Sequence, residues 1–328
     1  MPFQIEYIGN TSSEFQNDCT DFIKDWESAN AFIEVQTSGS TGKPKRFEVK
    51  KSAMQASARA TGEFFGFGQN QTILLCMSPK YIGGKMVIVR AMEFGMKVLA
   101  LEPSKNPLLE INQMIDFAAF VPVQVREILM NSGSKKKYEA ITNVIIGGAQ
   151  LGKKEFETIS NLNNNSFQTF GMTETLSHFA LKKISIDNDM YECLPGWEID
   201  TKEGRLMIKA NSVIEKDLLT NDIIEIESNG IFRFIGRADN AINSGGIKLF
   251  PEKIEAKLGG LIPNRFYISK KKDDKWGEAV VLVIESEVKE NLEESLRSVL
   301  DSKEMPKEII IQPQFKETGS GKVIREAF

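Results

Sequence analysis

Short apolar runs alternate with longer segments of helical pattern between Thr72 and Phe170. The runs are almost continuously apolar, which is typical of strands covered on both faces of a parallel sheet. The segments between them, such as Gly84–Phe94 and Lys153–Asn161, have the apolar spacing of helices. This alternation predicts βαβ units. The expected strands are residues 72–77, 97–101, 118–123, 143–147 and 166–170.

After Gly171 the pattern changes to short strands separated by turn residues, with Asn229-Gly230 as a hairpin signal. A polar, glycine-containing stretch at 236–246 follows, where we expect a domain boundary. The remainder predicts its own α+β unit, with helices at 251–258 and 289–300 and strands at 265–269, 279–285 and 308–312. We therefore expect an α/β protein with a large N-terminal domain (1–238) that combines a parallel sheet with a small antiparallel subdomain, and a small α+β C-terminal domain (239–328).

Composition narrows the class of protein. The 328 residues are 41% hydrophobic and 26% charged, which is ordinary for a globular protein, and the net charge of -4 argues against nucleic acid as the main partner. Three widely spaced cysteines without a CxxC pair indicate neither a disulfide framework nor a zinc site. Neither a signal peptide nor a run of ~18 apolar residues is present, so we expect a cytoplasmic protein without a membrane span.

The segment TSGSTGKPK, Thr37–Lys45, combines hydroxyls, glycines and two lysines. Small residues let the backbone approach a polyphosphate, while hydroxyls and N–H groups donate to its oxygens and Lys43 and Lys45 add positive charge. A Walker loop is excluded by the spacing of the glycines and by Pro44, which stands where that loop needs a hydroxyl. The alternative is a flexible surface loop.

A second segment, TFGMTET at Thr169–Thr175, follows a predicted strand of the parallel sheet, where ligands usually bind. Glu174 could hold a magnesium ion that also takes phosphate oxygens, and Thr173 could donate to a phosphate. The alternative is that Phe170 and Met172 belong to the core.

Three further features are ambiguous alone. Gly147-Gly148 offers either a backbone surface for a flat ring or a simple turn. Asp222 and Arg237 lie one hairpin apart and could hold a ribose, because a carboxylate accepts from both of its hydroxyls, or could form a structural ion pair. Lys322, flanked by glycines in Glu317–Arg325, could bring positive charge to a reacting carboxylate and phosphate, or could belong to a frayed terminus.

Together these segments resemble the adenylate-forming superfamily of acyl-CoA synthetases, adenylation domains and luciferases. The matching pieces appear in the superfamily's order between Thr37 and Arg325, including GRADNAINSGGIKLFPEKIE at Gly236–Glu255. The resemblance implies an N-terminally shortened form of that fold, with the large domain binding ATP and acid and the small domain acting as a mobile lid. It also implies ATP, Mg²⁺ and coenzyme A as a co-substrate, a small-molecule carboxylic acid as the partner, and a monomer or homodimer.

The resemblance also implies a role for individual residues. The β- and γ-phosphates would contact Thr37, Ser38, Gly39, Ser40, Thr41, Gly42, Lys43 and Lys45. The adenine would lie among Gly147, Gly148, Ala149, Thr169, Phe170, Gly171 and Met172. Thr173 would contact the α-phosphate, Glu174 the magnesium ion, and Asp222 with Arg237 the ribose. Lys322 would bridge carboxylate and α-phosphate. Asp239 would be the hinge, and the pantetheine thiol would approach Ser244, Gly245 and Gly246.

Some positions depart from the pattern. Only 36 residues precede the phosphate loop, so we expect the first subdomain to be largely absent. Tyr81 stands where many relatives have a histidine that gates the acyl pocket, and Asn221 replaces the glycine of a usual Thr-Gly-Asp. None of these changes removes a group needed for adenylation.

For the substrate, the compact chain and the run GMTETLSHFALKK are most similar to o-succinylbenzoate-CoA ligases of menaquinone biosynthesis. Ser177 and His178 are the candidates for the acid pocket, together with Tyr81 and Gly83. Lys80 and Lys85 could also offer charge, although solvated lysines are commoner. The alternatives are a histidine satisfied by backbone groups, another aryl- or acyl-CoA synthetase, a carrier-protein ligase, and a non-catalytic nucleotide-binding module.

Overall fold

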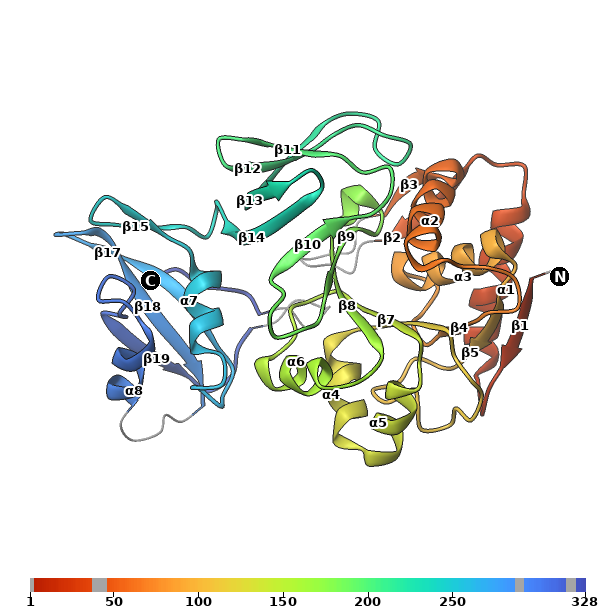
Figure 1. The fold of residues 1–328 in the computed structure, drawn as a ribbon, viewed down its shortest axis with the longest axis horizontal. Coiled ribbons are helices and arrows are strands. Elements are labelled where there is room, and N and C mark those ends of the chain that lie inside the picture. Colours follow the sequence, from red (N-terminus) through yellow and green to blue (C-terminus); the bar gives the residue numbers. More distant parts are fainter. Residues whose placement is uncertain (1–2, 37–45, 287–291, 317–322) are drawn as a thin grey trace.

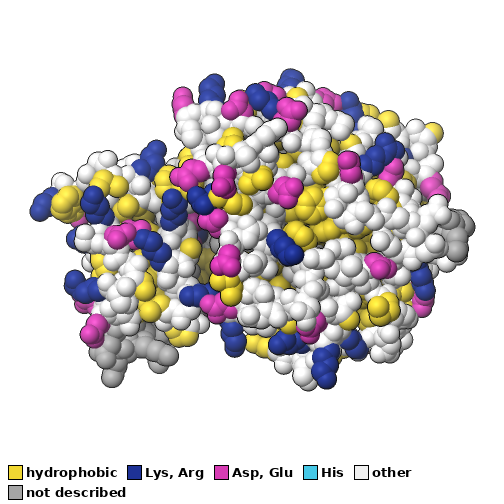
Figure 2. Space-filling view, in the orientation of Figure 1, with side chains coloured by type: hydrophobic (Ala, Val, Ile, Leu, Met, Phe, Trp, Pro, Cys, Tyr) yellow, Lys and Arg dark blue, Asp and Glu magenta, His cyan; other side chains and the backbone are white. Residues whose placement is uncertain are grey.

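A computed structural model describes residues 3–36, 46–286, 292–316 and 323–328. The strands form a twelve-stranded sheet, a five-stranded sheet and a two-stranded hairpin. Figure 1 shows two lobes, with the five-stranded sheet and its helices in blue beside the large sheet. Charged side chains of both signs line the junction of the lobes (Figure 2).

The large sheet has a parallel half and an antiparallel half. Its first six strands in space pair in parallel, and the direction changes where β8 meets β9. The expected antiparallel strands are present, and they continue the same sheet. In spatial order the strands are β1 (Gln4–Tyr7), β5 (Lys97–Ala100), β4 (Thr72–Leu75), β6 (Phe117–Phe120), β7 (Asn143–Ile146), β8 (Asn165–Gly171), β9 (His178–Lys183), β10 (Met190–Cys193), β14 (Ile231–Arg237), β13 (Leu218–Ser228), β12 (Arg205–Ile208) and β11 (Ile199–Lys202).

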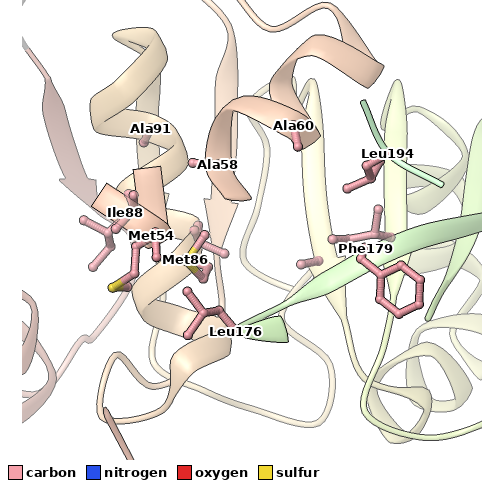
Figure 3. Packing of buried hydrophobic residues seen from close by; sticks show 14 of the residues in the cluster. Met54, Ala58, Ala60, Met86, Ile88, Ala91, Leu176, Phe179 and Leu194 are labelled. Atoms are coloured by element: carbon pink, nitrogen blue, oxygen red, sulfur yellow. The ribbon is translucent and has the colours of Figure 1, made fainter. Parts of the chain in front are cut away.

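Helices cover both faces of the parallel half, as its apolar strands require. On β4 the side chains of Ile73 and Leu75 enter one core and that of Leu74 enters the other. The first core holds α1 (Ser13–Glu27), α2 (Lys51–Phe65) and α3 (Ile82–Phe94), and the second holds α4 (Pro122–Met130), α5 (Ser132–Glu139) and α6 (Lys153–Ser160). In Figure 3, Met54 of α2 lies close to Ile88 and Met86 of α3, and Leu176 reaches the same junction.

The C-terminal lobe has its own sheet and core. Strand pairing passes from one sheet to the other between Arg237 and Ile242, near the expected boundary at 238/239. That the two lobes are separate domains, one of them mobile, stays a prediction. The elements are β15 (Ile242–Ser244), β16 (Ile247–Leu249), α7 (Pro251–Leu258), β17 (Phe266–Asp273), β18 (Gly277–Glu285), α8 (Leu292–Val299) and β19 (Glu308–Gln312).

Two local differences from expectation have simple causes. The strand expected at 118–123 ends at Phe120, because Pro122 begins α4, where its missing N–H costs nothing. The hairpin of β2 (Phe32–Gln36) and β3 (Arg46–Lys50) was not predicted. Among the described residues, no helix is both long and apolar enough to cross a bilayer.

Candidate functional site

Several of the predicted site residues follow the carboxyl ends of neighbouring parallel strands. Tyr81 follows β4, Gly147 directly follows β7, and Gly171 ends β8. Strands β7 and β8 are adjacent and in register, with Ile146 opposite Gln168. This end of an open parallel sheet is where ligands bind in α/β proteins.

The expected phosphate loop and Lys322 lie outside the described residues. The loop positions concerned are Thr37, Ser38, Gly39, Ser40, Thr41, Gly42, Lys43 and Lys45. The residues that flank the loop are described. Gln36 pairs with Arg46 across the hairpin and forms a bridge with Tyr81. Both flanks therefore lie at the end of the sheet that also carries Gly147 and Gly171, although the role of the loop stays a prediction.

The segment after β8 forms a short 3-10 turn, Thr173–Thr175. The Thr175 hydroxyl accepts from the Met172 N–H at 3.0 Å and lies 2.7 Å from the Ser177 carbonyl oxygen, so it fixes the turn from within. Thr173 and Glu174 remain exposed. The turn therefore presents a hydroxyl and a carboxylate to solvent, which a phosphate and its metal ion could reach.

Phe170, which we expected beside the adenine, also packs against other aromatic side chains of the large sheet. Its ring packs against Phe179, Tyr191, Phe232 and Phe234, with centroids 5.1–5.6 Å away. These contacts tie β8 to strands β9, β10 and β14. The side chain is thus partly buried against the core, and its role beside the adenine stays a prediction.

Gly171 is required by close packing. A Cβ there would lie 2.4 Å from the Ser177 carbonyl oxygen and 2.6 Å from the His178 Cα, and both are backbone atoms. We expect Gly171→Ala to lower the free energy of unfolding by about 1–3 kcal/mol, the usual cost of overpacking. Gly68→Ala is the matched control, since a Cβ at that position would have no neighbouring atom within 4 Å. Denaturant unfolding measures both, and equal stabilities would contradict the packing argument.

The glycines after β7 lie against β8. A Cβ on Gly147 would be 2.6 Å from the Thr169 hydroxyl oxygen, and Gly148 has a φ of 89°, which favours glycine. Gly147 and Thr169 therefore form a surface of backbone and a small side chain, and Gly148 and Ala149 follow Gly147 directly in the sequence. Such a surface could receive a flat ring, but the adenine role stays a prediction.

Asp222 and Arg237 face each other across β13 and β14. The Arg237 Nη1 lies 3.1 Å from the Asp222 Oδ1, and Asp239 takes the other side of the guanidinium at 2.8 and 3.0 Å. Burial raises the pKa of Asp222, while the Arg237 charge opposes that rise. Asn221 also donates to Asp239 at 3.4 Å. The ribose candidates and the hinge candidate therefore share one polar network.

Ser244, Gly245 and Gly246, the residues expected near the pantetheine thiol, lie in the other lobe. They form the turn between β15 and β16, where Gly245 and Gly246 have φ values of 57° and 78°. The Gly245 N–H donates to the Trp276 carbonyl at 2.8 Å. The turn is thus anchored on the five-stranded sheet, apart from the strand ends of the large sheet.

The acid-pocket candidates Ser177 and His178 meet a residue that the sequence reasoning missed, Arg90 of α3. Arg90 is 2% exposed, and its Nη2 donates to the Ser177 hydroxyl at 3.0 Å. Its Nε has no hydrogen-bond partner among the described residues. Burial lowers the pKa of Arg90 to about 10, so its charge costs the folded protein free energy.

The same surroundings keep His178 neutral. Its ring nitrogens lie near the hydroxyls of Ser177 and Thr61, at 3.2 and 3.3 Å, so its partners are side chains and not the backbone groups of the alternative reading. Burial, and then the charge of Arg90, lower the pKa of His178 well below its ordinary value. The site thus combines a buried cation with neutral polar groups.

One sequence signal could have revealed Arg90. It interrupts the apolar run MVIVRAMEF in a helix whose residues from Met86 to Ala91 are all buried. A charge in such a helix is costly unless something pairs with it. The two lysines considered for the acid pocket instead contact residues of α1. Lys80 pairs with Glu14 and Asp18, and Lys85 lies over the Phe22 ring at 4.5 Å.

Glu174 is chemically suitable for a magnesium ion, because that ion usually takes one or two carboxylates together with substrate phosphates. The described part of the chain contains no cluster of three or more His, Cys, Asp or Glu side chains that could hold a metal by itself. A metal at Glu174 would therefore depend on phosphate oxygens.

Residues 22–202 match the family of AMP-binding enzymes. The chain belongs to this family. The matched range includes the segment at Thr37–Lys45 and the block at Thr169–Thr175, and it extends through β11.

Named relatives agree with the family match. A 2-succinylbenzoate--CoA ligase of Listeria monocytogenes is 24% identical over 93% of this chain and 71% of its own length. A probable 2-succinylbenzoate--CoA ligase of Mycobacterium tuberculosis is 26% identical over 89% and 82%.

Solved structures share the fold. The AMP-forming acyl-CoA synthetase/AMP-acid ligase II-like protein of Dyadobacter fermentans is 34% identical, covers 96% of this chain and 93% of that one, and has a TM-score of 0.68. The o-succinylbenzoate CoA synthetase (MenE) of Bacillus subtilis with OSB-AMP is 20% identical, covers 88% and 67%, and has a TM-score of 0.73. The chain therefore shares its fold with these solved structures.

Proposed function

We propose that this AMP-binding enzyme is an ATP-dependent carboxylic acid–CoA ligase that acts on o-succinylbenzoate through an acyl-adenylate. A carboxylate oxygen would attack the α-phosphorus of ATP, so that pyrophosphate leaves. The thiol of coenzyme A would then attack the acyl carbon and release AMP, which leaves the thioester. The relatives with this named activity and the polar site at Arg90 support the proposal.

The observation that carries the substrate assignment is the buried, incompletely paired guanidinium of Arg90. o-Succinylbenzoate has two carboxylates, of which only one is activated. The other stays charged and needs a cation if it is enclosed, since burying an unpaired carboxylate is costly. A simple fatty acid or benzoate has no second carboxylate, so the cost of burying Arg90 favours a dicarboxylic substrate.

The residues that would handle ATP follow from the site. Thr173 would donate to the α-phosphate and Asp222 with Arg237 would hold the ribose. Magnesium would withdraw charge from the phosphate oxygens, and Glu174 would be its ligand. Coenzyme A would enter near Ser244–Gly246 after the C-terminal lobe turns about Asp239, a lid motion of the kind that couples successive steps at one site.

Pyrophosphate release with a panel of acids tests the proposal. We expect o-succinylbenzoate to support rapid release, with benzoate and medium-chain fatty acids at background. Rapid release with a monocarboxylic acid and none with o-succinylbenzoate would refute the substrate assignment. In the second half-reaction, supplying either free coenzyme A or a carrier protein shows which thiol accepts the acyl group.

Asp222→Asn tests the ribose role. The amide loses the charge that pairs with Arg237 and one of the acceptors for the ribose hydroxyls. We expect KM for ATP to rise about 10-fold, the effect of roughly 1.4 kcal/mol, with KM for the acid unchanged. Asp189→Asn is the matched control. Asp189 pairs with Arg233, which lies on β14 like Arg237. An unchanged KM for ATP in Asp222→Asn would remove this residue from the site.

A further inference from the structure

A continuous chain of polar groups runs from Arg90 into helix α2. The Arg90 Nη2 lies 3.0 Å from the Ser177 Oγ, which lies 3.2 Å from the His178 Nδ1. The His178 Nε2 lies 3.3 Å from the Thr61 Oγ1, which donates to the Ser57 carbonyl at 3.1 Å. Thr61 and His178 are 0% and 5% exposed, so water does not substitute for these contacts.

The groups at the two ends of this row of polar groups fix the direction of its hydrogen bonds. A guanidinium can only donate, so the Ser177 oxygen accepts from Arg90 and its hydrogen is free to point to the His178 Nδ1. A carbonyl can only accept, so the Thr61 hydrogen goes to Ser57 and the Thr61 oxygen accepts from the His178 Nε2. The Thr61 end therefore requires a proton on Nε2. Burial and the Arg90 charge lower the pKa of His178, so the imidazole stays neutral and Nδ1 is free to accept from Ser177.

We propose that Thr61 is a positioning residue for substrate recognition, because it fixes the tautomer of His178 and thereby the orientation of Arg90. The proposal rests on the proposed function, in which Arg90 receives the second carboxylate of the acid. With the Ser177 lone pair held toward it, the guanidinium is anchored through Nη2. The Nε is buried and has no partner among the described residues, so its hydrogen would be left to pair with the substrate carboxylate.

The effect of removing the Thr61 hydroxyl follows from the same pattern of hydrogen-bond donors and acceptors. Without the Thr61 oxygen, a proton on Nε2 would be buried without a partner, which is unfavourable. The proton would move to Nδ1, which would then face Ser177 as a donor. The Ser177 oxygen would then accept from both Nδ1–H and Arg90, and its own hydrogen would lose its acceptor. The hydroxyl would rotate toward another acceptor, and the guanidinium bonded to it would shift.

The chain contains a single histidine, so one imidazole accounts for every histidine signal in a nitrogen-15 NMR spectrum. In the wild-type protein we expect a protonated Nε2 and an unprotonated Nδ1. In Thr61→Val we expect the proton on Nδ1 or a mixture of tautomers. Thr61→Ser keeps the hydroxyl and should restore the wild-type spectrum.

Kinetics provide the second readout. We expect Thr61→Val to raise KM for o-succinylbenzoate about 5- to 10-fold, the effect of one lost hydrogen bond, without changing KM for ATP. Tyr138→Phe is the control, since it removes a buried hydrogen bond of 2.8 Å to Ser166 in the other core. It should change stability but neither the histidine spectrum nor KM.

The two readouts separate the possible failures. A wild-type spectrum with the proton on Nδ1 overturns the proposed role of Thr61, whatever the variants do. In Thr61→Val, a tautomer change without a change in KM, or a KM change with the wild-type tautomer, also overturns it. If the wild-type enzyme does not use o-succinylbenzoate, the proposed function fails, while the spectrum still decides whether Thr61 sets the tautomer.

Discussion

Arg90→Met should raise KM for o-succinylbenzoate roughly 100-fold, because a charge-assisted pair between a guanidinium and an enclosed carboxylate contributes about 3 kcal/mol. KM for ATP should not change. Methionine is unbranched, flexible and of similar length, so it should keep the apolar packing around position 90. Initial rates of pyrophosphate release at varied acid and ATP concentrations measure both constants.

The same variant should be at least as stable as the wild-type protein without ligand. The charge of Arg90 is buried with a neutral hydroxyl as its partner, and replacing such a charge by an apolar side chain is often neutral or stabilising. Thermal unfolding tests this point. A variant that unfolds early and keeps its affinity for the acid would show that Arg90 is structural.

Lys322→Ala should have the largest effect on catalysis. Charge builds between the acid and the α-phosphate during adenylation, and removing a group that stabilises such charge typically costs about 100- to 1000-fold in rate. The role of Lys322 rests on the terminal GSGK segment. We expect acid-dependent pyrophosphate release to collapse, while thioester formation from a supplied acyl-adenylate continues.

A nearby lysine gives the control. Lys316 is exposed and pairs with Glu326, and such surface pairs contribute about 0–1 kcal/mol. Lys316→Ala should therefore leave both half-reactions intact. Equal losses of adenylation and thioester formation in Lys322→Ala would mean that this lysine does not act in the first step alone.

Much of the fold was predictable because its signals are local. The near-continuous apolar runs at β4, β5 and β7 indicate strands covered on both faces, and helices do cover both faces. Helix α7 and strand β19 begin and end where expected. The continuation of the sheet through β9 could not be read from the sequence, since it depends on pairing between distant residues.

The site was predictable only where residues are close in sequence or follow strand ends. Thr173 and Glu174 belong to one turn, and Asp222 and Arg237 face each other across one hairpin. The polar chain behind Ser177 was missed, because Thr61 and Arg90 lie on two helices that only the fold brings to β9. No local pattern links these two helices to Ser177, so only the folded structure shows the contacts.

A crystal structure with a stable analogue of o-succinylbenzoyl-adenylate would show directly which residues bind the acid and the nucleotide. We expect the free carboxylate of the analogue about 3 Å from a guanidinium nitrogen of Arg90. We also expect the ribose hydroxyls on Asp222 and the phosphate beside Thr173. An adenylate bound with its carboxylate away from Arg90, or with its ribose and phosphate at different faces of the large sheet, would contradict the proposed site.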